Sequence, residues 1–227
     1  MIRLNMIVEG QTEEAFVNRL LKPHLAYRAV FVAVRCVETG RRGNKIFRGG
    51  LLNYEKAKKD ITLWMKEDQS SDAKFTTMFD LYRLPNNFPS MDTARQQTDI
   101  NSRVQILESN FAQSISNNRF IPYIQLHEFE ALLFSDIEKL SFYYPDQKSN
   151  INKLVEQSKK FTNPEHINDG PTTSPSKRII HELNSYDGDK ASAGPEVATQ
   201  IGLATIRAKC PHFNSWLAQL EDLNNQK

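Results

Sequence analysis

Cysteine and glycine are both scarce in this chain of 227 residues. The two cysteines, Cys36 and Cys210, are too few for a disulfide framework or for a zinc site with four thiolates. Nine glycines are fewer than the usual share of about 7% would give, which excludes collagen-like and low-complexity chains. We therefore expect a globular protein of a reducing compartment.

Long apolar runs and an excess of one charge are also missing. The longest uncharged apolar run is far shorter than the roughly 20 residues that cross a bilayer. No basic segment followed by an apolar one marks a signal peptide. We expect a cytoplasmic protein that does not contact a membrane. Lysine and arginine total 29 against 27 acidic residues, which excludes a histone-like protein and an acidic disordered tail.

Hydrophobic residues make up 39% of the chain, enough for the core of one full-sized domain. Over the first 135 residues, β-branched runs alternate with segments of helical periodicity, which predicts βαβ crossovers. The predicted fold is α/β, with a mainly parallel, four-stranded, Rossmann-like sheet flanked by helices. We expect strands over 2–8, 29–37, 74–80 and 119–126, and helices over 12–27, 51–67 and 100–116.

Three residues are expected to shape these elements. Pro23 should kink or end the first helix, because proline lacks a backbone N–H. Asp99 is a suitable N-cap for the helix over 100–116. Pro122 indicates an edge or a bulge in the fourth strand.

The chain changes character after about residue 136, because no clear strand follows and turn residues concentrate over 162–175. We expect residues 136–227 to form a helical C-terminal part that packs on the α/β core of residues 1–135 as one structural unit. Cys210 and Pro211 should begin the last helix, with proline at its first position. The expected helices cover 147–161, 175–184, 195–209 and 212–223.

Acidic residues follow three of the four predicted strands. Glu9 ends the first strand, Glu13 lies one turn into the next helix, and Asp80 ends the third strand. The fourth strand runs into residues 127–130, His-Glu-Phe-Glu. Carboxyl ends of parallel strands meet at one edge of a sheet, where these carboxylates would repel one another unless a hard cation lay between them. The pattern predicts an Mg²⁺ or Mn²⁺ site, and the alternative is a set of solvated strand ends.

The residues 8–13, Val-Glu-Gly-Gln-Thr-Glu, resemble the opening motif of the TOPRIM domain, which topoisomerases, bacterial primases and overcoming-lysogenization-defect (OLD) nucleases share. The motif is most similar to that of the OLD nucleases, where the first Glu and the Glu four residues later both serve metal sites. This resemblance covers about residues 1–135. Residues 127–133, 170–178 and 210–213 resemble a bacterial TOPRIM-like family, domain of unknown function 4276, and that resemblance covers nearly the whole chain.

One position departs from the TOPRIM pattern. The resemblance implies a D-x-D motif at the end of the third strand, but Asp80 is followed two residues later by Tyr82. A two-metal site would then need Glu128, Glu130 or Asp92 to supply the missing oxygen. Residues 128 and 130 would diverge by about 200° on a helix. We therefore expect only one glutamate, with a preference for Glu128, to face the site.

His127 is expected to be a structural histidine, since no other histidine lies at a zinc-site spacing from it.

Basic residues form a second group of candidates. Residues 39–54 carry four glycines, four basic residues and no acid, which predicts a flexible loop that binds a phosphate backbone; an ordinary solvated loop is an equal alternative. The loop lacks the spacing of a P-loop. In the C-terminal part, Lys177 is a candidate to neutralise transition-state charge, and Arg178 and Lys190 are candidates to bind nucleic acid. The alternative is that Lys177, Arg178 and Lys190 are ordinary charged residues on the surface. The four basic residues of the loop are Arg41, Arg42, Lys45 and Arg48.

These features predict a nuclease that depends on Mg²⁺ or Mn²⁺ and cuts DNA or RNA. OLD nucleases carry an ATPase on the same chain, so the resemblance implies a separate ATPase of the AAA or ABC type, as in phage-defence or mobile-element loci. The alternatives are a TOPRIM-like subunit that only binds such a partner, and a metal-dependent nucleotide phosphotransferase. Whether the chain forms a homodimer stays open. The expected catalytic residues are Glu9, Asp80 and Lys177, and the expected metal ligands are Glu9, Glu13, Asp80, Glu128 and Glu130.

Overall fold

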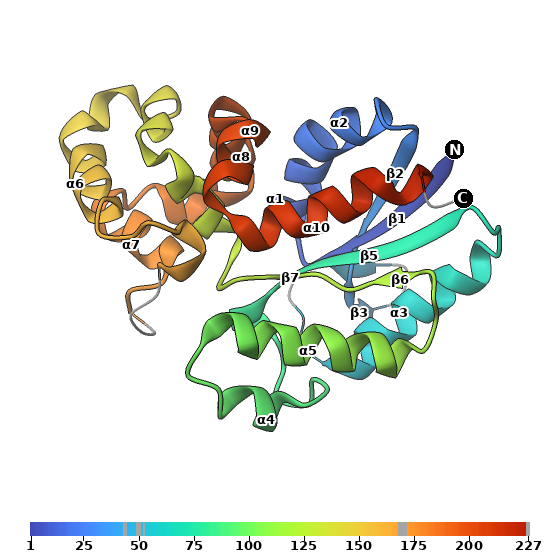
Figure 1. The fold of residues 1–227 in the computed structure, drawn as a ribbon. Helices are drawn as coiled ribbons and strands as arrows, with labels where there is room; N and C mark the ends of the chain where they lie inside the picture. The colour runs from blue at the N-terminus through green and yellow to red at the C-terminus, as the bar shows by residue number, and fades with distance from the viewer. Residues whose placement is uncertain (43–44, 49–50, 52, 168–171, 226–227) are drawn as a thin grey trace.

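A computed structural model describes residues 1–42, 45–48, 51, 53–167 and 172–225 (Figure 1). The side chains of residues 38–50 lie outside the described part. A parallel sheet occupies the middle of the molecule, helices cover both of its faces, and a helical region extends beyond one end of the strands. The predicted α/β fold with a helical C-terminal part is confirmed. No helix among the described residues is long and apolar enough to cross a membrane.

The main sheet has the strand order β2-β1-β5-β6, all parallel, and β7 pairs with β5 farther along. The central strands β1 (Ile2–Val8) and β5 (Ala73–Asp80) are buried almost throughout, as expected for strands covered on both faces. Val8 of β1 pairs with Met78 of β5 and with Cys36 of β2 (Val30–Cys36). The three strands therefore end at the same edge.

The fourth predicted strand is broken into β6 (Phe120–Ile121) and β7 (Ile124–Gln125). Pro122 has no backbone N–H, so the hydrogen-bond ladder cannot continue through it. The Thr77 side chain spans the break: the Tyr123 N–H donates to Thr77 Oγ1 at 3.1 Å, and the Thr77 hydroxyl donates to the Tyr123 carbonyl at 3.0 Å. The chain thereby stays on the sheet up to residue 126.

One face of the sheet is covered by a continuous helix over residues 11–26. It consists of α1 (Gln11–Phe16), a π-helical turn (Val17–Leu21) and α2 (Lys22–Ala26). The helix continues past Pro23, and its wide turn directly precedes this proline, which cannot supply an i→i−4 hydrogen bond. The predicted helix over 12–27 is confirmed, and the alternative that Pro23 ends it is wrong.

The opposite face is covered by α3 (Tyr54–Glu67), α4 (Met91–Arg95) and α5 (Ile100–Ile115). Asp99 caps α5 as predicted, because its carboxylate accepts a hydrogen bond from the Ser102 N–H at 2.8 Å. A short 3₁₀ turn (Leu81–Arg83) joins β5 to this side of the molecule.

The C-terminal part contributes to the apolar layer on the first face. There α8 (Tyr186–Ile201) packs against α1, and in α10 (Pro211–Glu221) the Trp216 indole donates to the Thr76 hydroxyl of β5 at 3.0 Å. The predicted bounds 195–209 are wrong, because α8 begins earlier and Gly202, at φ +81°, separates it from α9 (Leu203–Lys209). The other helices are α6 (Lys148–Ser158), α7 (Pro175–Glu182) and 3₁₀ turns at Phe129–Ser135, Ile137–Phe142, Pro145–Gln147, Pro164–His166 and Asp222–Asn224.

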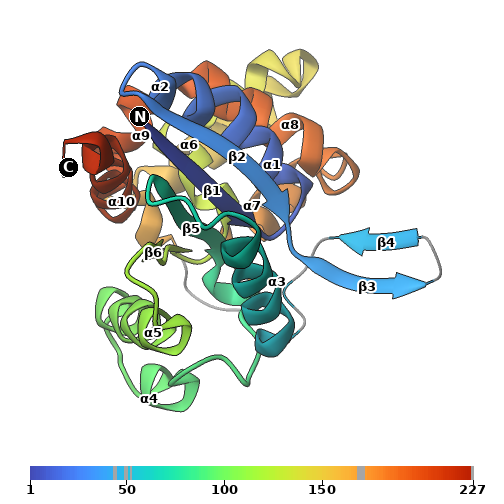
Figure 2. The ribbon, with the colours of Figure 1, turned by 90° about the vertical axis from the view of Figure 1, so that its right-hand side faces the viewer.

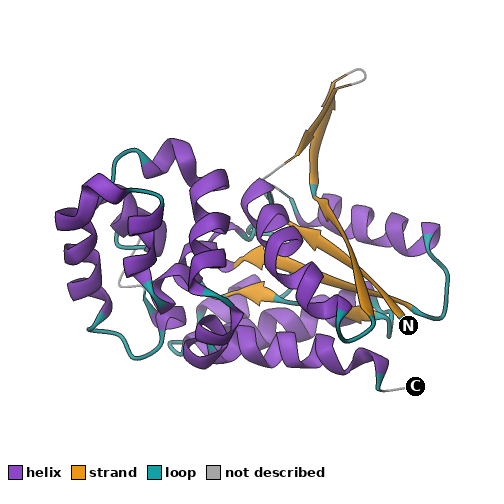
Figure 3. Ribbon diagram, turned by 90° about the horizontal axis from the view of Figure 1, so that it is seen from above, coloured by secondary structure: helices purple, strands orange, loops and turns teal. Residues whose placement is uncertain are grey.

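An antiparallel hairpin of β3 (Glu38–Arg42) and β4 (Lys45–Arg48) projects from the end of β2 (Figures 2 and 3). In its backbone, Arg41 pairs with Ile46 and Arg42 pairs with Lys45. The sequence analysis expected a flexible loop over residues 39–54, whereas residues 39–42 and 45–48 form paired strands. The hairpin leaves the sheet at the edge where β1 and β5 also end.

Candidate metal centre

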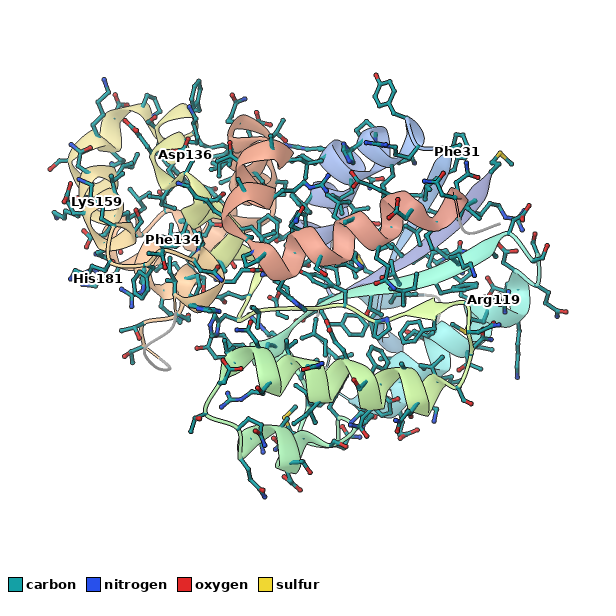
Figure 4. The ribbon with its side chains drawn as sticks, in the orientation of Figure 1. Phe31, Arg119, Phe134, Asp136, Lys159 and His181 are labelled. Carbon is teal, nitrogen blue, oxygen red and sulfur yellow. The ribbon has the colours of Figure 1, made fainter. Side chains whose placement is uncertain are left out.

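The carboxyl ends of β1 and β5 face the C-terminal helices. In Figure 4, Arg119 lies toward the amino ends of the strands, whereas Lys159 and His181 lie in the helices beyond the other end. Residues from the two strand ends and from the C-terminal part together line a pocket of about 180 Å³, which we call the acidic pocket. All five carboxylates that the sequence analysis expected as metal ligands line it. The lining residues are Glu9, Thr12, Glu13, Asp80, Arg83, Glu128, Glu130 and Lys190.

Glu9 and Asp80 lie side by side because their strands are neighbours in register. The Asp80 N–H donates to Glu9 Oε2 at 3.3 Å, which ties the two strand ends together. Glu13 reaches back along the first turn of α1, where its Oε2 accepts from the Gly10 N–H at 2.8 Å. This contact is one half of a capping box, and it holds the Glu13 carboxylate beside Glu9.

Glu128 and Glu130 both face the acidic pocket, so the expectation that only one of them would do so is wrong. Glu128 has an extended backbone and precedes the 3₁₀ turn that contains Glu130, so the 200° divergence of an α-helix does not apply. Ser176, at the start of α7, holds Glu128 through its N–H at 2.6 Å and its hydroxyl at 3.0 Å. The Tyr186 hydroxyl of α8 donates to Glu130 at 3.4 Å.

Burial and mutual repulsion raise the pKa of three acids of the pocket, Glu9, Asp80 and Glu130. Burial, and then the charge of Glu13, raise the pKa of Glu9 to about 7. Burial, and then the charge of Glu128, raise the pKa of Glu130 to about 8. The pKa of Asp80 is raised well above its ordinary value, first by burial and then by Glu13 and Glu9. If all of these acids were ionised, the pocket would hold more negative charge than its own hydrogen bonds stabilise.

A divalent cation fits this donor set. Asp80 Oδ1 is buried and has no hydrogen-bond partner within the described part of the chain. An unpaired buried polar atom lowers the stability of the fold by about 1–3 kcal/mol. Among the described residues, no group of three carboxylates, imidazoles or thiols is arranged closely enough to hold one ion. Mg²⁺ does not require this, because it usually keeps several waters and takes only one or two carboxylates. Asp80 and Glu9 can supply them.

Two basic residues, Arg83 and Lys190, also line the acidic pocket. Arg83 Nε lies 4.0 Å from Glu9 Oε1, on an otherwise exposed side chain. Lys190 of α8 pairs with Asp187 at 3.5 Å and lowers the pKa of Glu130. Lys190 was expected among the basic candidates, whereas the sequence analysis missed Arg83 and Thr12. The feature that could have indicated Arg83 as a site residue is its position at the end of the 3₁₀ turn that follows Asp80.

Other candidate residues lie away from the acidic pocket. Lys177 is exposed on α7 and does not line the pocket, and neither does Asp92 of α4. The Arg178 guanidinium donates to the Thr173 carbonyl at 2.7 Å. Arg41, Arg42, Lys45 and Arg48 belong to the hairpin, where the side chains lie outside the described residues.

Tyr82 and His127 face away from the carboxylates, although each is close to one of them in sequence. Their ring centroids lie 5.4 Å apart, and both line a second cavity. Burial lowers the pKa of His127 to about 4. The histidine is therefore neutral at physiological pH, and it does not line the acidic pocket.

Comparison with known protein families gave a match that spans most of the chain. A model described as "Domain of unknown function (DUF4276)" matches residues 8–221. Comparison with curated proteins gave no significant match, and comparison with solved structures gave none either.

Proposed function

Since the chain belongs to the family of domain of unknown function 4276, whose description states no activity, we propose its function from the site: divalent-metal-dependent hydrolysis of phosphodiester bonds in nucleic acid. The observation that carries the proposal is the acidic pocket itself. Four carboxylates line the pocket beside Asp80, whose Oδ1 atom is buried without a hydrogen-bond partner among the described residues: Glu9 after β1, Glu13 in α1, and Glu128 and Glu130 at the 3₁₀ turn. The resemblance of residues 8–13 to the TOPRIM motif of OLD nucleases supports it.

The chemistry of the lining residues favours Mg²⁺ or Mn²⁺. Every acceptor that we assign to the ion is a carboxylate oxygen, and none of the described residues lines the pocket with an imidazole or a thiol. Hard oxygen donors suit these two ions, whereas Zn²⁺ sites usually contain imidazole or thiolate. Glu9 and Asp80 would hold the ion, and Glu13, Glu128 and Glu130 would add charge and bind its waters.

A bound divalent ion polarises a phosphoryl oxygen and generates a nucleophile from water at neutral pH. The residues of the chain then have separate tasks. Arg83 and Lys190, at the rim beside the carboxylates, offset the negative charge of a phosphodiester that approaches five acids. We assign this task to them in place of Lys177, which does not line the pocket. Ser176 and Tyr186 orient Glu128 and Glu130 by hydrogen bonds.

The experiment combines metal binding with cleavage. Wild-type protein should bind Mn²⁺ and cut at least one substrate from a panel of single- and double-stranded DNA and RNA. Asp80→Asn should abolish Mn²⁺ binding and slow cleavage by two or more powers of ten, because it removes a central ligand and keeps the shape. Glu14→Gln is the matched control, since Glu14 lies in the same first turn as Glu13 but outside the pocket. Equal cleavage by Asp80→Asn and wild type would refute the proposal.

A further inference from the structure

A second cavity, also of about 180 Å³, shares a wall with the acidic pocket. Tyr82 and His127 line this cavity, whereas Asp80 and Glu128 line the acidic pocket. The Tyr82 N–H donates to the His127 carbonyl at 3.0 Å, so the two chain segments run side by side. Because consecutive Cα atoms are about 3.8 Å apart, the wall between the cavities is only one or two residues thick.

Two residues that line the cavity each carry a buried polar atom with no hydrogen-bond partner within the described part of the chain. These atoms are Nδ1 of His127, a residue that is only 4% exposed, and Nε of Arg103. The guanidinium of Arg103 is held in place by a hydrogen bond from Nη2 to the Gln97 carbonyl at 3.0 Å. An unpaired buried polar atom is costly, so two of them on one small cavity indicate a ligand that forms hydrogen bonds.

The backbone at His127 is in the left-handed region, with φ at +62°. A residue other than glycine adopts this conformation rarely and at an energetic cost. At this point of the chain, two neighbouring residues line different cavities. His127 lines the second cavity and Glu128 lines the acidic pocket. Strain of this kind is concentrated at functional sites.

The remaining walls combine apolar and basic side chains. Leu84, Met91 and Ile100 line the cavity together with Arg95 and Arg103, and the Tyr82 ring stands at it with 41% of the residue exposed. These walls disfavour a metal ion, because they neither replace its hydration nor offset its charge. A planar heteroaromatic ring suits them, since it can stack on Tyr82 and accept or donate hydrogen bonds at its edge.

We propose that this cavity binds a nucleobase of the nucleotide whose phosphate lies at the acidic pocket, an assignment that rests on the proposed function. Tyr82 stacks on the base, and His127 and Arg103 bind its edge through the two unpartnered atoms. The thin wall between the cavities matches the short distance between a phosphate and its own base. The base belongs either to a single-stranded polynucleotide or to a free nucleotide, and the chemistry of recognition is the same.

The probe is 2-aminopurine, a base whose fluorescence is quenched when it stacks. We would titrate the protein against a short single strand with phosphorothioate linkages and one 2-aminopurine, and separately against 2-aminopurine riboside monophosphate. Quenching by the strand alone assigns the cavity to a polynucleotide, and quenching by the mononucleotide assigns it to a nucleotide; either supports the proposal. Tyr82→Ala should weaken the quenched complex about 10-fold, as expected for one lost base stack.

Matched variants separate recognition from folding. Tyr82→Phe should retain the affinity, because it keeps the ring, and Tyr27→Ala should have no effect, because Tyr27 is 91% exposed and does not line the cavity. His127→Asn should also weaken binding, and asparagine tolerates the left-handed backbone. Unchanged quenching in both Tyr82→Ala and His127→Asn, or no quenching of either probe by the wild type, would overturn the proposal.

A Mn²⁺ titration without nucleic acid keeps the two proposals apart. Tyr82→Ala should bind Mn²⁺ as the wild type does, because Tyr82 does not line the acidic pocket. Mn²⁺ binding without quenching of 2-aminopurine would refute the base site alone. Quenching that depends on Tyr82, in a protein that binds no Mn²⁺, would support the base site and refute the metal-dependent function.

Discussion

Replacing Glu9 by glutamine is expected to stabilise the protein when no divalent metal is present. Glu9 has a pKa of about 7 in the fold against 4.5 in the unfolded chain. At 1.36 kcal/mol for each pH unit, this difference costs the folded state about 3 kcal/mol above pH 7. Glutamine keeps the shape and still accepts the hydrogen bond from the Asp80 N–H, but it carries no charge. Burial of its amide reduces the gain, so we expect about 1–3 kcal/mol.

The sign of the effect depends on pH in a specific way. Below pH 4.5 the Glu9 carboxyl is protonated in both states and contributes nothing. Between 4.5 and about 7 it is ionised mainly in the unfolded chain, so unfolding releases a proton and the stability of the metal-free wild type falls as pH rises. Above about 7 the cost is complete. The Glu9→Gln variant lacks this part of the pH dependence.

Thermal unfolding in EDTA at pH 5 and pH 8 measures the effect. The melting temperature of Glu9→Gln should exceed that of the wild type by more at pH 8 than at pH 5, at about 2–4 °C for each kcal/mol in a chain of this size. Excess Mg²⁺ should reverse the order, because only the wild type gains the full binding free energy. Glu14→Gln controls for a generic change in charge. An equal difference in melting temperature at both pH values would refute the reasoning.

Two further predictions concern the support of the site and its surroundings. Ser176→Ala should weaken Mn²⁺ affinity about 10-fold in a calorimetric titration, because Glu128 loses the hydrogen bond from the Ser176 hydroxyl at 3.0 Å. Replacement of the exposed Ser192 on α8 by alanine is the control. Equal Mn²⁺ affinities of Ser176→Ala and the wild type would refute an orienting role. Replacing all four basic residues of the β3–β4 hairpin by alanine should flatten the salt dependence of nucleic-acid binding by a slope of roughly three to four, and an unchanged slope would show that the hairpin does not bind phosphates.

Much of the acidic pocket could be predicted because strand ends are easy to recognise in a sequence. A buried apolar run that ends in an acid places that acid at the carboxyl edge of a parallel sheet, and this was sufficient to single out Glu9 and Asp80. Glu13 followed from helical spacing, and Asp99 followed from capping chemistry. Each of these inferences depends on contacts within one element or between adjacent strands.

The features that sequence reasoning missed depend on contacts between distant segments. The 3₁₀ geometry after Glu128 is stabilised by Ser176, 48 positions later, so the shared orientation of Glu128 and Glu130 had no local signal. Arg83 appeared to be an ordinary surface residue until the turn after β5 placed it beside Glu9. The four glycines of residues 39–54 predict a loop, whereas Ile46 and Phe47, which favour strands, lie in β4 of the hairpin.

The wall of the acidic pocket is assembled from residues near opposite ends of the described chain, Glu9 and Lys190. During synthesis from the N-terminus, the first strand is therefore available long before α7 and α8, which hold Glu128 and Glu130 in place. Until those helices emerge and dock, Glu128 and Glu130 lack the hydrogen bonds that hold them beside the strand ends. A nascent chain would consequently lack the assembled acidic pocket until α7 and α8 have docked.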